Sequence, residues 1–483
     1  MTRRAMILLR ARMSGAQAEN LPVPPLVLHG VIMSALAFVA RGELQGFAYA
    51  TFVLTVVAAL VALPLLGEFS HLLRADPAEE WVAALPATAR ELRLARAMHV
   101  ALVLAWLSLG SVLPAALFLP DGGIVARLGL IVCALGLVLT LAGGLFGAQA
   151  LLGERAEAGL VLLQTLLFAG AVIGFVLAPS MLPVLAELGA IGDAAWTWAW
   201  PPAWFAAPLS GSLEHALAPL AAAAVGVFVL IAVPPAPHTR AARRAPLLAR
   251  MLAPVRAVAN RAWIRRDERP IFDLVFDALP LEREVVLRTY PLVGVPIAFV
   301  VIGATDADAV TRTDLLGILY FTACIYLPVL LMHVPASESH RASWILRTHP
   351  TPPGALGNAI VKAITLRFLV PLYVALGAIG CAQAGLSVVP RLALPGFLIS
   401  VLVLRFLTPA TVRDLPLSVP TDEVETQYDW SGVLMGIGIA LTIVAVFVNR
   451  KLTGVGGGLA LSGVLLAFEL VSDRRARAVS AAG

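Results

Sequence analysis

The stretch from Gly46 to Leu66 reads GFAYATFVLTVVAALVALPLL and contains no charged residue. As a helix it would be about 30 Å long, which matches the hydrocarbon core of a bilayer. Similar runs recur along the 483-residue chain, which is 59% hydrophobic and only 13% charged. An ordinary soluble chain carries about 25% charged residues. The sequence therefore predicts an all-α, polytopic membrane protein.

Twelve apolar runs are candidates for membrane spans, and the first and seventh of them are short. In the first half of the chain they are Pro25–Ala40, Gly46–Leu66, Met98–Leu119, Arg127–Leu152, Gly159–Val184 and Leu217–Val233. In the second half they are Tyr290–Gly303, Asp314–Val334, Arg367–Ala384, Leu392–Pro409, Ser431–Val448 and Val455–Val471.

The distribution of basic residues predicts the orientation of these spans. With the N-terminus inside, roughly 27 of the 35 Lys and Arg residues fall on cytoplasmic segments and about 5 outside. Arg450–Lys451 is the exception. We therefore expect both termini in the cytoplasm and the chain in the cell (inner) membrane. The basic excess then reflects this asymmetry and does not indicate nucleic-acid binding.

The two halves share one plan, which predicts an internal repeat: residues 1–235 and 290–483 form two six-span halves, joined by a connecting segment, 236–289. Apolar residues alternate with Arg in this segment, which predicts an amphipathic helix on the inner leaflet; they are Leu247, Leu248, Met251, Leu252, Val255, Val258 and Trp263. The acidic residues that follow, Asp267, Glu268, Asp273, Asp277, Glu282 and Glu284, are either solvated or in contact with a partner.

In each half, a long loop between the second and third spans carries an acidic residue, then Trp, Pro and a later cation. The first loop contains Glu80, Trp81, Pro86, Thr88, Glu91 and Arg96, and the second contains Glu338, Trp344, Pro350 and Lys362. We expect each loop to form a helix–turn–helix at the membrane surface, because Trp favours the interface and Pro ends a helix. Thr88 and Glu91 predict a capping box. The simpler alternative is an ordinary surface loop.

The predicted outer loop Leu185–Ala216 contains no Lys or Arg and is rich in aromatic residues. Its candidate lid residues are Trp196, Trp198, Trp200, Pro201, Pro202, Trp204 and Phe205. Two interpretations remain open: an aromatic belt at the interface, or a re-entrant or interfacial helix that closes a pathway.

The run Leu85-Pro86-Ala87-Thr88-Ala89-Arg90-Glu91-Leu92, followed by Arg96, resembles the coupling loop of ABC-2 type exporter permeases. The resemblance implies a six-span permease whose loops between spans two and three contact a cytoplasmic ATPase. Twelve spans would then make a pseudo-dimer within one chain. The second loop lacks a counterpart of Glu91. The second half also has only the short turn Arg450–Gly454 where the family's outer re-entrant element would lie.

The chain contains no Gly-x-x-x-x-Gly-Lys-Ser/Thr motif, so ATP would be bound by a separate subunit. We expect no enzymatic activity, metal or cofactor in this chain itself. Charged residues in the spans are few, and we expect Arg367, Arg405 and Glu469 to extend toward the membrane interface.

These observations predict the transmembrane permease subunit of an ATP-driven ABC-2 type exporter, with a separate ABC ATPase and membrane lipid as partners. The alternatives are an ion-coupled secondary transporter with internal repeats, which the scarcity of midplane charge disfavours, and a membrane-embedded enzyme, for which no cluster of His, Asp or Glu is apparent.

Overall fold

The computed structural model describes residues 23–66, 88–120, 123–152, 155–210, 213–233, 250–305, 317–321, 323–337, 339–348, 352, 354–420 and 454–482. The chain divides into two compact units, Met1–Arg240 and Ala241–Gly483. Each unit is described by itself below. The predicted amphipathic residues Leu247 and Leu248 and the predicted turn at Arg450 lie outside the described residues.

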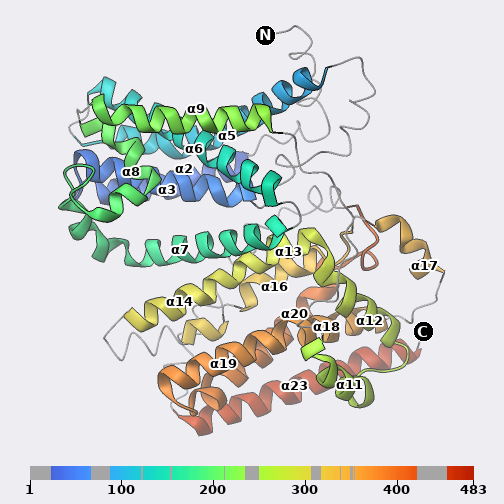
Figure 1. The fold of residues 1–483 in the computed structure, drawn as a ribbon. Coiled ribbons are helices and arrows are strands. Elements are labelled where there is room, and N and C mark those ends of the chain that lie inside the picture. Colours follow the sequence, from blue (N-terminus) through green and yellow to red (C-terminus); the bar gives the residue numbers. More distant parts are fainter. Residues whose placement is uncertain are drawn as a thin grey trace. The chain divides into compact units, whose positions relative to one another are not determined.

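Unit 1 is a bundle of long apolar helices that run side by side (Figure 1). The long helices are α2 (Val23–Ala40), α3 (Gly46–Leu66), α5 (Ala89–Leu117), α6 (Ile124–Leu152), α7 (Arg155–Ala186) and α9 (Leu217–Ala232). Short helical pieces connect α7 to α9: η2 (Ala195–Ala199), α8 (Pro201–Ala206), η3 (Ala207–Ser210) and η4 (Leu213–Ala216).

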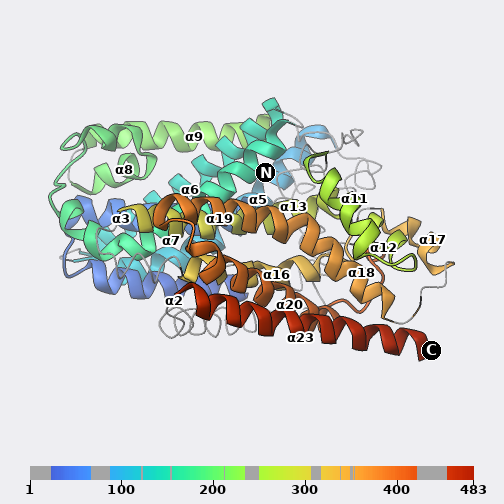
Figure 2. The ribbon, with the colours of Figure 1, turned by 90° about the horizontal axis from the view of Figure 1, so that it is seen from below.

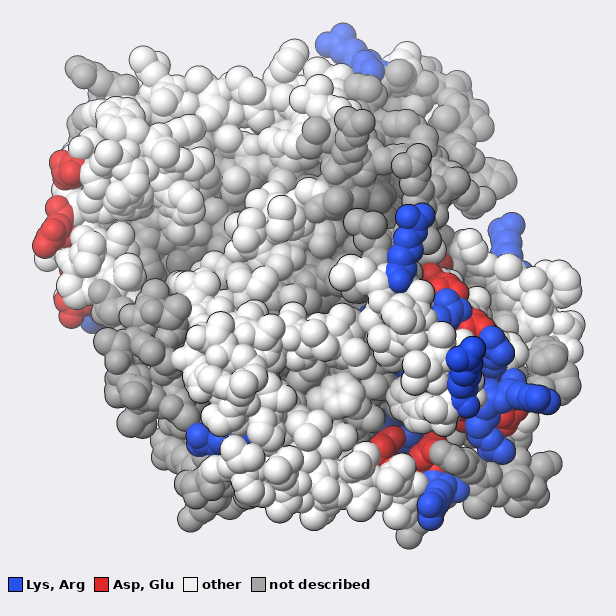
Figure 3. All heavy atoms as spheres, turned by 60° about the horizontal axis from the view of Figure 1, so that its bottom comes forward, with Lys and Arg blue, Asp and Glu red and all other residues white. Residues whose placement is uncertain are grey.

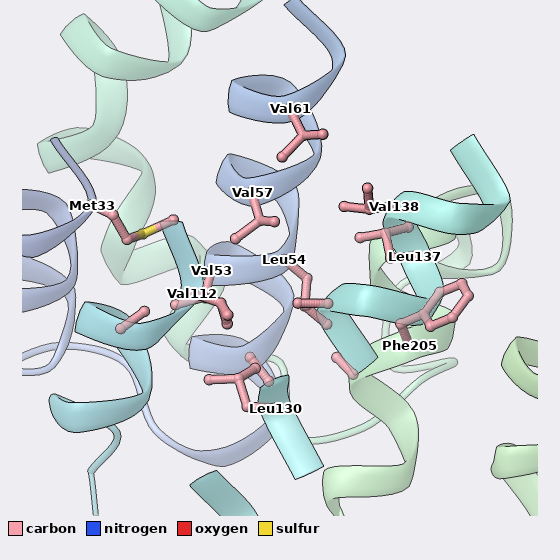
Figure 4. Packing of buried hydrophobic residues seen from close by; sticks show 14 of the residues in the cluster. Met33, Val53, Leu54, Val57, Val61, Val112, Leu130, Leu137, Val138 and Phe205 are labelled. Carbon is pink, nitrogen blue, oxygen red and sulfur yellow. The ribbon is translucent and has the colours of Figure 1, made fainter. Parts of the chain in front are cut away.

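Helix α3 lies in the centre of this bundle. Val53, Leu54, Val57 and Val61 on α3 are all fully or almost fully buried. Figure 4 shows Met33 of α2 and Val112 of α5 on one side of α3, and Leu130, Leu137 and Val138 of α6 on the other. Since α3 has no polar face, it is buried from several sides at once.

A close contact between two glycines joins α6 and α9. A Cβ atom on Gly143 would lie 2.4 Å from the Cα atom of Gly226, so both positions require the absence of a side chain. Small residues at this kind of contact let helix backbones approach closely, which is how helices associate when lipid removes the hydrophobic drive.

Unit 2 begins with short helices and continues with apolar ones. The first group is α11 (Ala253–Ala262), α12 (Arg269–Ala278), η5 (Leu279–Leu281), α13 (Arg283–Thr289) and η6 (Tyr290–Val293). Next come α14 (Gly294–Thr305), α16 (Ala323–Met332), η7 (His340–Ser343) and α17 (Trp344–Arg347). The last group is α18 (Ala355–Ile364), η8 (Thr365–Leu369), α19 (Val370–Ala384), η9 (Val389–Ala393), α20 (Leu394–Thr411) and α23 (Val455–Ala482).

Segments α18, η8 and α19 form one continuous helix, so the ninth predicted span begins earlier in the chain than Arg367. Both η8 and η9 are π-helical turns, a rare geometry that occurs often at functional sites.

Helices α20 and α23 are parallel neighbours (Figure 2). At their beginnings, Gly458 lies against Pro390 and Arg391, and near their ends Arg405 pairs with Glu469. Helix α20 ends and α23 begins at opposite ends of this pair, and the chain between Thr411 and Gly454 joins them. The predicted span Ser431–Val448 falls in this interval and lies outside the described residues.

The described helices have the length and composition of membrane spans. Six are long and apolar enough to cross a bilayer, and shorter apolar helices coincide with Leu26–Ala40, Val161–Gly174, Leu217–Ala232, Tyr290–Ile302 and Gly317–Met332. Many of their large apolar side chains are exposed, among them Val31, Leu117, Val132, Phe228, Val374, Phe406 and Val464. Such a surface suits lipid and not water. The chain is therefore an all-α membrane protein, and the number twelve stays a prediction.

One buried tyrosine contact recurs in the two units. In unit 1, the Tyr49 hydroxyl of α3 donates a hydrogen bond to the Ala115 carbonyl of α5 at 2.8 Å. In unit 2, the Tyr320 hydroxyl, just before α16, donates to the Leu376 carbonyl of α19 at 3.1 Å. Each Tyr belongs to the second predicted span of its half and each carbonyl to the third. The two units therefore share a contact between equivalent spans, in addition to the similar loop sequences.

We predict that Gly143→Ala destabilises the protein, because the new methyl group would collide with the backbone of α9. The expected loss is about 1–3 kcal/mol, the usual cost of overpacking. Gly144→Ala is the matched control, since its Cβ meets nothing within 4 Å and Ala favours helix. Thermal unfolding in detergent should place G143A below wild type and G144A at or above it. Equal midpoints for the two variants would contradict the contact.

Candidate functional site

The second of the two Trp-containing loops, which lies in unit 2, is held in place at its start. The backbone of Ala336 pairs with that of Val419 in a parallel bridge. Val419 N–H donates to the Pro335 carbonyl at 2.9 Å, and Ser337 N–H donates to the Val419 carbonyl at 3.0 Å. The Ser337 hydroxyl also donates to the Glu282 carboxylate at 2.9 Å. The segment that follows α16 is therefore held against the segment that follows α20.

Beyond this bridge the chain forms η7 and α17, which we call the α17 segment (residues 340–347). Trp344 is 62% exposed and its neighbour Ile345 is 56% exposed. Helix α17 ends at Arg347, and α18 begins at Ala355 as the first part of the long apolar helix Ala355–Ala384, so the predicted helix–turn–helix at the membrane surface stays a prediction. Glu338 and Pro350 lie outside the described residues. The exposed apolar pair on a short helix gives this loop a surface that a protein partner could bury.

The far end of the second loop is fixed by Lys362, which is fully buried. Its ammonium lies 2.7 Å from the Glu268 carboxylate, and the exposed fractions of the two side chains are 0% and 1%. The ammonium also donates to the Trp263 carbonyl at 3.0 Å. Lys362 therefore does not reach the loop surface. It joins α18 to the turn between α11 and α12, where Glu268 precedes the first residue of α12.

A second ion pair extends this cluster to α20 and α23. Arg405 donates from Nε to the Glu469 carboxylate at 2.8 and 3.0 Å and from Nη1 to the Asn358 amide oxygen at 2.8 Å. Asp473 lies between the two pairs, 3.8 Å from Lys362 Nζ and 3.7 Å from Arg405 Nη2. We call these residues the buried ion cluster: Glu268, Asn358, Lys362, Arg405, Glu469 and Asp473.

The cluster corrects one expectation and supplies residues that the sequence did not reveal. Arg405 and Glu469 pair with each other, which the sequence did not predict. Glu268, predicted to be solvated or in contact with a partner, is buried inside the unit. Its spacing could have shown this, since Glu268 lies on the same helical face as the buried Ile271, Phe272, Val275 and Phe276.

Charged side chains of both signs gather on one part of the surface in Figure 3, and ion pairs involve Arg256 of α11, Asp273 of α12 and the turn between these helices. Arg256 of α11 donates to Asp273 at 2.6 Å and to Asp277 at 2.9 and 3.0 Å. Burial lowers the pKa of Arg256, but these hydrogen bonds and the two negative charges outweigh it and raise the pKa. Met251, Val255 and Val258 of the predicted amphipathic stripe are exposed, whereas Leu252 is buried.

In unit 1, the structure describes the part of the first loop from Thr88 onward. The predicted capping box is confirmed: Glu91 N–H donates to the Thr88 hydroxyl, and the Glu91 carboxylate accepts from Thr88 N–H. Helix α5 therefore begins at Ala89. Arg96 is buried and its guanidinium lies 4.2 Å from the centre of the Phe146 ring. The other predicted residues of this loop, Glu80, Trp81 and Pro86, lie outside the described residues.

The aromatic outer segment of unit 1 folds back onto the bundle. Phe205 of α8 is buried against Gly136, about 18 Å along α6 from its first residue. The indole of Trp200 donates to the Thr55 hydroxyl at 2.9 Å, about 13 Å along α3.

Other residues of this segment divide between an inner and an outer face. Pro202 is buried with Phe205, Pro201 and Trp204 are half-buried, and the Trp204 indole donates to the Trp198 carbonyl at 2.9 Å. Trp196, Trp198 and Trp200 are exposed. Helix α8 is the part that packs into the bundle, and the two interpretations of the segment stay open.

No family model, curated protein or solved structure matches the chain. Within the part of the chain that the structure describes, no group of three or more His, Cys, Asp or Glu residues could hold a metal ion. The class is therefore defined by the fold alone: a helical membrane protein of two units, one of which carries a buried ion cluster beside an exposed loop helix.

We predict that Lys362→Met destabilises the protein strongly. The change leaves Glu268 buried without its cation, and removing one partner of a buried pair costs about 3–5 kcal/mol. Arg269→Gln removes a solvent-exposed pair with Asp273 instead and should cost less than about 1 kcal/mol. Thermal unfolding in detergent distinguishes them. If K362M unfolds at the same temperature as R269Q, the pair does not hold this part of the unit together.

We also predict measurable coupling between Trp200 and Thr55. The single changes Trp200→Phe and Thr55→Val and the double variant form a thermodynamic cycle, for which we expect a coupling of about 0.5–1.5 kcal/mol. Trp198→Phe combined with Thr55→Val is the control, because the Trp198 indole has no hydrogen bond to Thr55. A coupling near zero for the Trp200 cycle would argue against the inserted position of α8.

Proposed function

We propose that this chain is the transmembrane permease subunit of an ATP-driven exporter of the ABC-2 type, with a separate ATPase subunit. The observation that carries the proposal is the second loop of unit 2. This loop presents an exposed Trp344 on the short α17 segment between two fixed ends. Such a loop can transmit a displacement from the ATPase to the membrane helices, because each of its ends is bonded to a membrane helix.

The two ends of the loop determine where a push would be transmitted. At its start, the bridge at Ala336 connects the loop to the chain that follows α20. At its end, Lys362 connects it to Glu268 and, through Asp473, to α23. A partner that displaces the α17 segment would therefore act on α16, α18, α20 and α23 together. Alternating access in transporters depends on this kind of group motion.

The first loop supports the same role with a different construction. Its helix α5 starts at a complete capping box and continues as one helix of 29 residues. A force applied at Thr88 would pass along this helix at least as far as Pro114, the proline inside it. The contact of Arg96 with Phe146 would carry it to α6. We propose that the two loops bind two ATPase subunits, and that the two six-span halves act as a pseudo-dimer with both termini in the cytoplasm.

The outer segment fits a lid in this proposal. Helix α8 lies within the unit 1 bundle and is anchored by Phe205 and Trp200. A short helix inserted from the outer side could close a pathway until the spans move apart. In this mechanism the chain supplies the pathway and the partner supplies ATP hydrolysis.

We predict that Trp344→Ala releases the ATPase from the complex. The partner would be an ATPase with a P-loop, encoded beside this gene. Affinity purification of the full-length chain should retain it, and W344A should retain at least tenfold less, since a buried interface Trp contributes about 2 kcal/mol or more. Trp106→Ala is the matched control, because Trp106 is an exposed Trp on the membrane helix α5.

Three outcomes would contradict the proposal: no ATPase co-purifies with wild-type protein, W344A and W106A retain equal amounts of it, or transport persists without ATP. Glu91→Ala is less informative than W344A, because the loss of the capping box also weakens the start of α5.

A second candidate, an ion-coupled secondary transporter, is favoured by one observation. The buried ion cluster contains three carboxylates and two cations, so its ionisable groups are close enough to exchange partners. Uptake that follows an ion gradient and is abolished by Asp473→Asn would favour this function over the exporter.

A further inference from the structure

An apolar groove of about 410 Å³ lies between α19 and the η9–α20 helix in unit 2. Its lining is Val370, Tyr373, Val374, Gly377, Ala378, Cys381, Val389, Ala393, Leu394 and Phe397. All of these residues belong to helices that are long and apolar enough to span a membrane. The medium that faces the groove is therefore lipid.

The one hydroxyl group in this lining is directed away from it. The Tyr373 hydroxyl donates to the Tyr320 carbonyl at 2.5 Å and contacts the Ser400 hydroxyl at 2.7 Å, both in the buried core of the unit. Tyr373 thus contributes its ring to the groove. A ligand that fills the groove makes apolar contacts only, which fits an acyl chain and excludes a sugar or a nucleotide.

The groove has the length of one acyl chain in one leaflet. From Val370 to Cys381 the helix rises about 16 Å. The hydrocarbon core of a bilayer is about 30 Å thick, so each leaflet contributes about 15 Å.

Arg367 lies one turn before the groove on the same continuous helix, within the π-helical turn η8. Its side chain is only 2% exposed. Among the described residues, its Nε and Nη1 atoms have no hydrogen-bond partner and no carboxylate pairs with it. A buried guanidinium without an anion is costly in protein and in lipid alike. The Arg367 guanidinium lies 5.3 Å from the centre of the Phe276 ring of α12.

Asp277 is the carboxylate that interacts electrostatically with Arg367, and it is already paired with another cation. Asp277 accepts two hydrogen bonds from Arg256, which also lies over the Phe276 ring. Two guanidinium groups therefore share this aromatic ring, and one of them, Arg256, is neutralised by carboxylates. The other has two free donors suited to the oxygens of a phosphate group.

We propose that Arg367 and this groove form a binding site for an anionic phospholipid, with the phosphate on the guanidinium and one acyl chain between α19 and α20. In such a lipid the phosphate is attached to one end of the acyl chain. Arg367 and the groove follow each other along one helix in the same way. Phe276 covers the guanidinium, so the head group would enter where α12 lies against α18. The site does not depend on an ATPase.

The test is a titration of the detergent-purified full-length chain with dioleoyl phosphatidylglycerol, dioleoylglycerol and inorganic phosphate. Native mass spectrometry measures lipid occupancy, and thermal unfolding measures stabilisation by all three. We expect phosphatidylglycerol to bind at least tenfold more tightly than either of the others, because only this lipid has both parts. Arg367→Gln should weaken its binding about tenfold or more.

Two further variants sharpen the test. Gly377→Leu places a side chain in the groove where a Cβ meets nothing within 4 Å, and should weaken lipid binding without disturbing the backbone. Arg391→Gln, at the other π-helical turn, is the matched control and should change binding less than twofold. If R367Q does not accumulate as folded protein, the lipid affinity of G377L alone tests the site.

Four results would overturn the site. They are wild-type affinity in folded R367Q or G377L, equal binding of dioleoylglycerol and phosphatidylglycerol, equal binding of inorganic phosphate, or a larger effect of R391Q than of R367Q.

Discussion

The ion pair between Lys362 and Glu268 is the contact on which one end of unit 2 depends. Both side chains are excluded from solvent, so each charge is tolerable only because the other lies 2.7 Å away. Lys362 belongs to a membrane helix, and Glu268 belongs to the connecting segment before it. The pair therefore fixes an amphipathic surface segment to the start of a span. Asp473 and Arg405 extend this fixation to α20 and α23, so four chain segments meet at one set of charges.

The apolar interior follows a different rule, and the two together explain how the units are held. In lipid, apolar helices gain little by hiding apolar surface, so close packing has to hold them. Gly143 and Gly226 allow such packing in unit 1, and Gly458 lies close to the backbone of Pro390 and Arg391 in unit 2. Tyr49 and Tyr320 each add a hydrogen bond to a carbonyl of the third span. Buried ionic contacts therefore join four segments of unit 2, while close glycine contacts join helix pairs in both units.

The sequence predicted the features that depend on local composition. Runs such as Gly46–Leu66 identify a helix by their own residues, and Thr88 with Glu91 places the start of α5 within the same turn. Ion pairing could not be predicted in this way, because Arg405 and Glu469 are 64 residues apart and meet only when α20 and α23 are neighbours. Glu268 was accessible to sequence reasoning through its helical face. Phe205 was a candidate from the sequence, but its position against Gly136 required the structure.

A rigid end and an exposed helix have to occur together if a loop is to transmit force. Trp344 alone would be a surface residue of the kind that many proteins carry. Lys362 alone would be a buried pair with a structural role. Our proposal depends on their combination within one loop, with the Ala336 bridge at its other end. A flexible loop would absorb a displacement at Trp344 in its own backbone. In the proposed permease, a displacement at Trp344 would pass through the Ala336 bridge and the buried ion cluster to α18, α20 and α23.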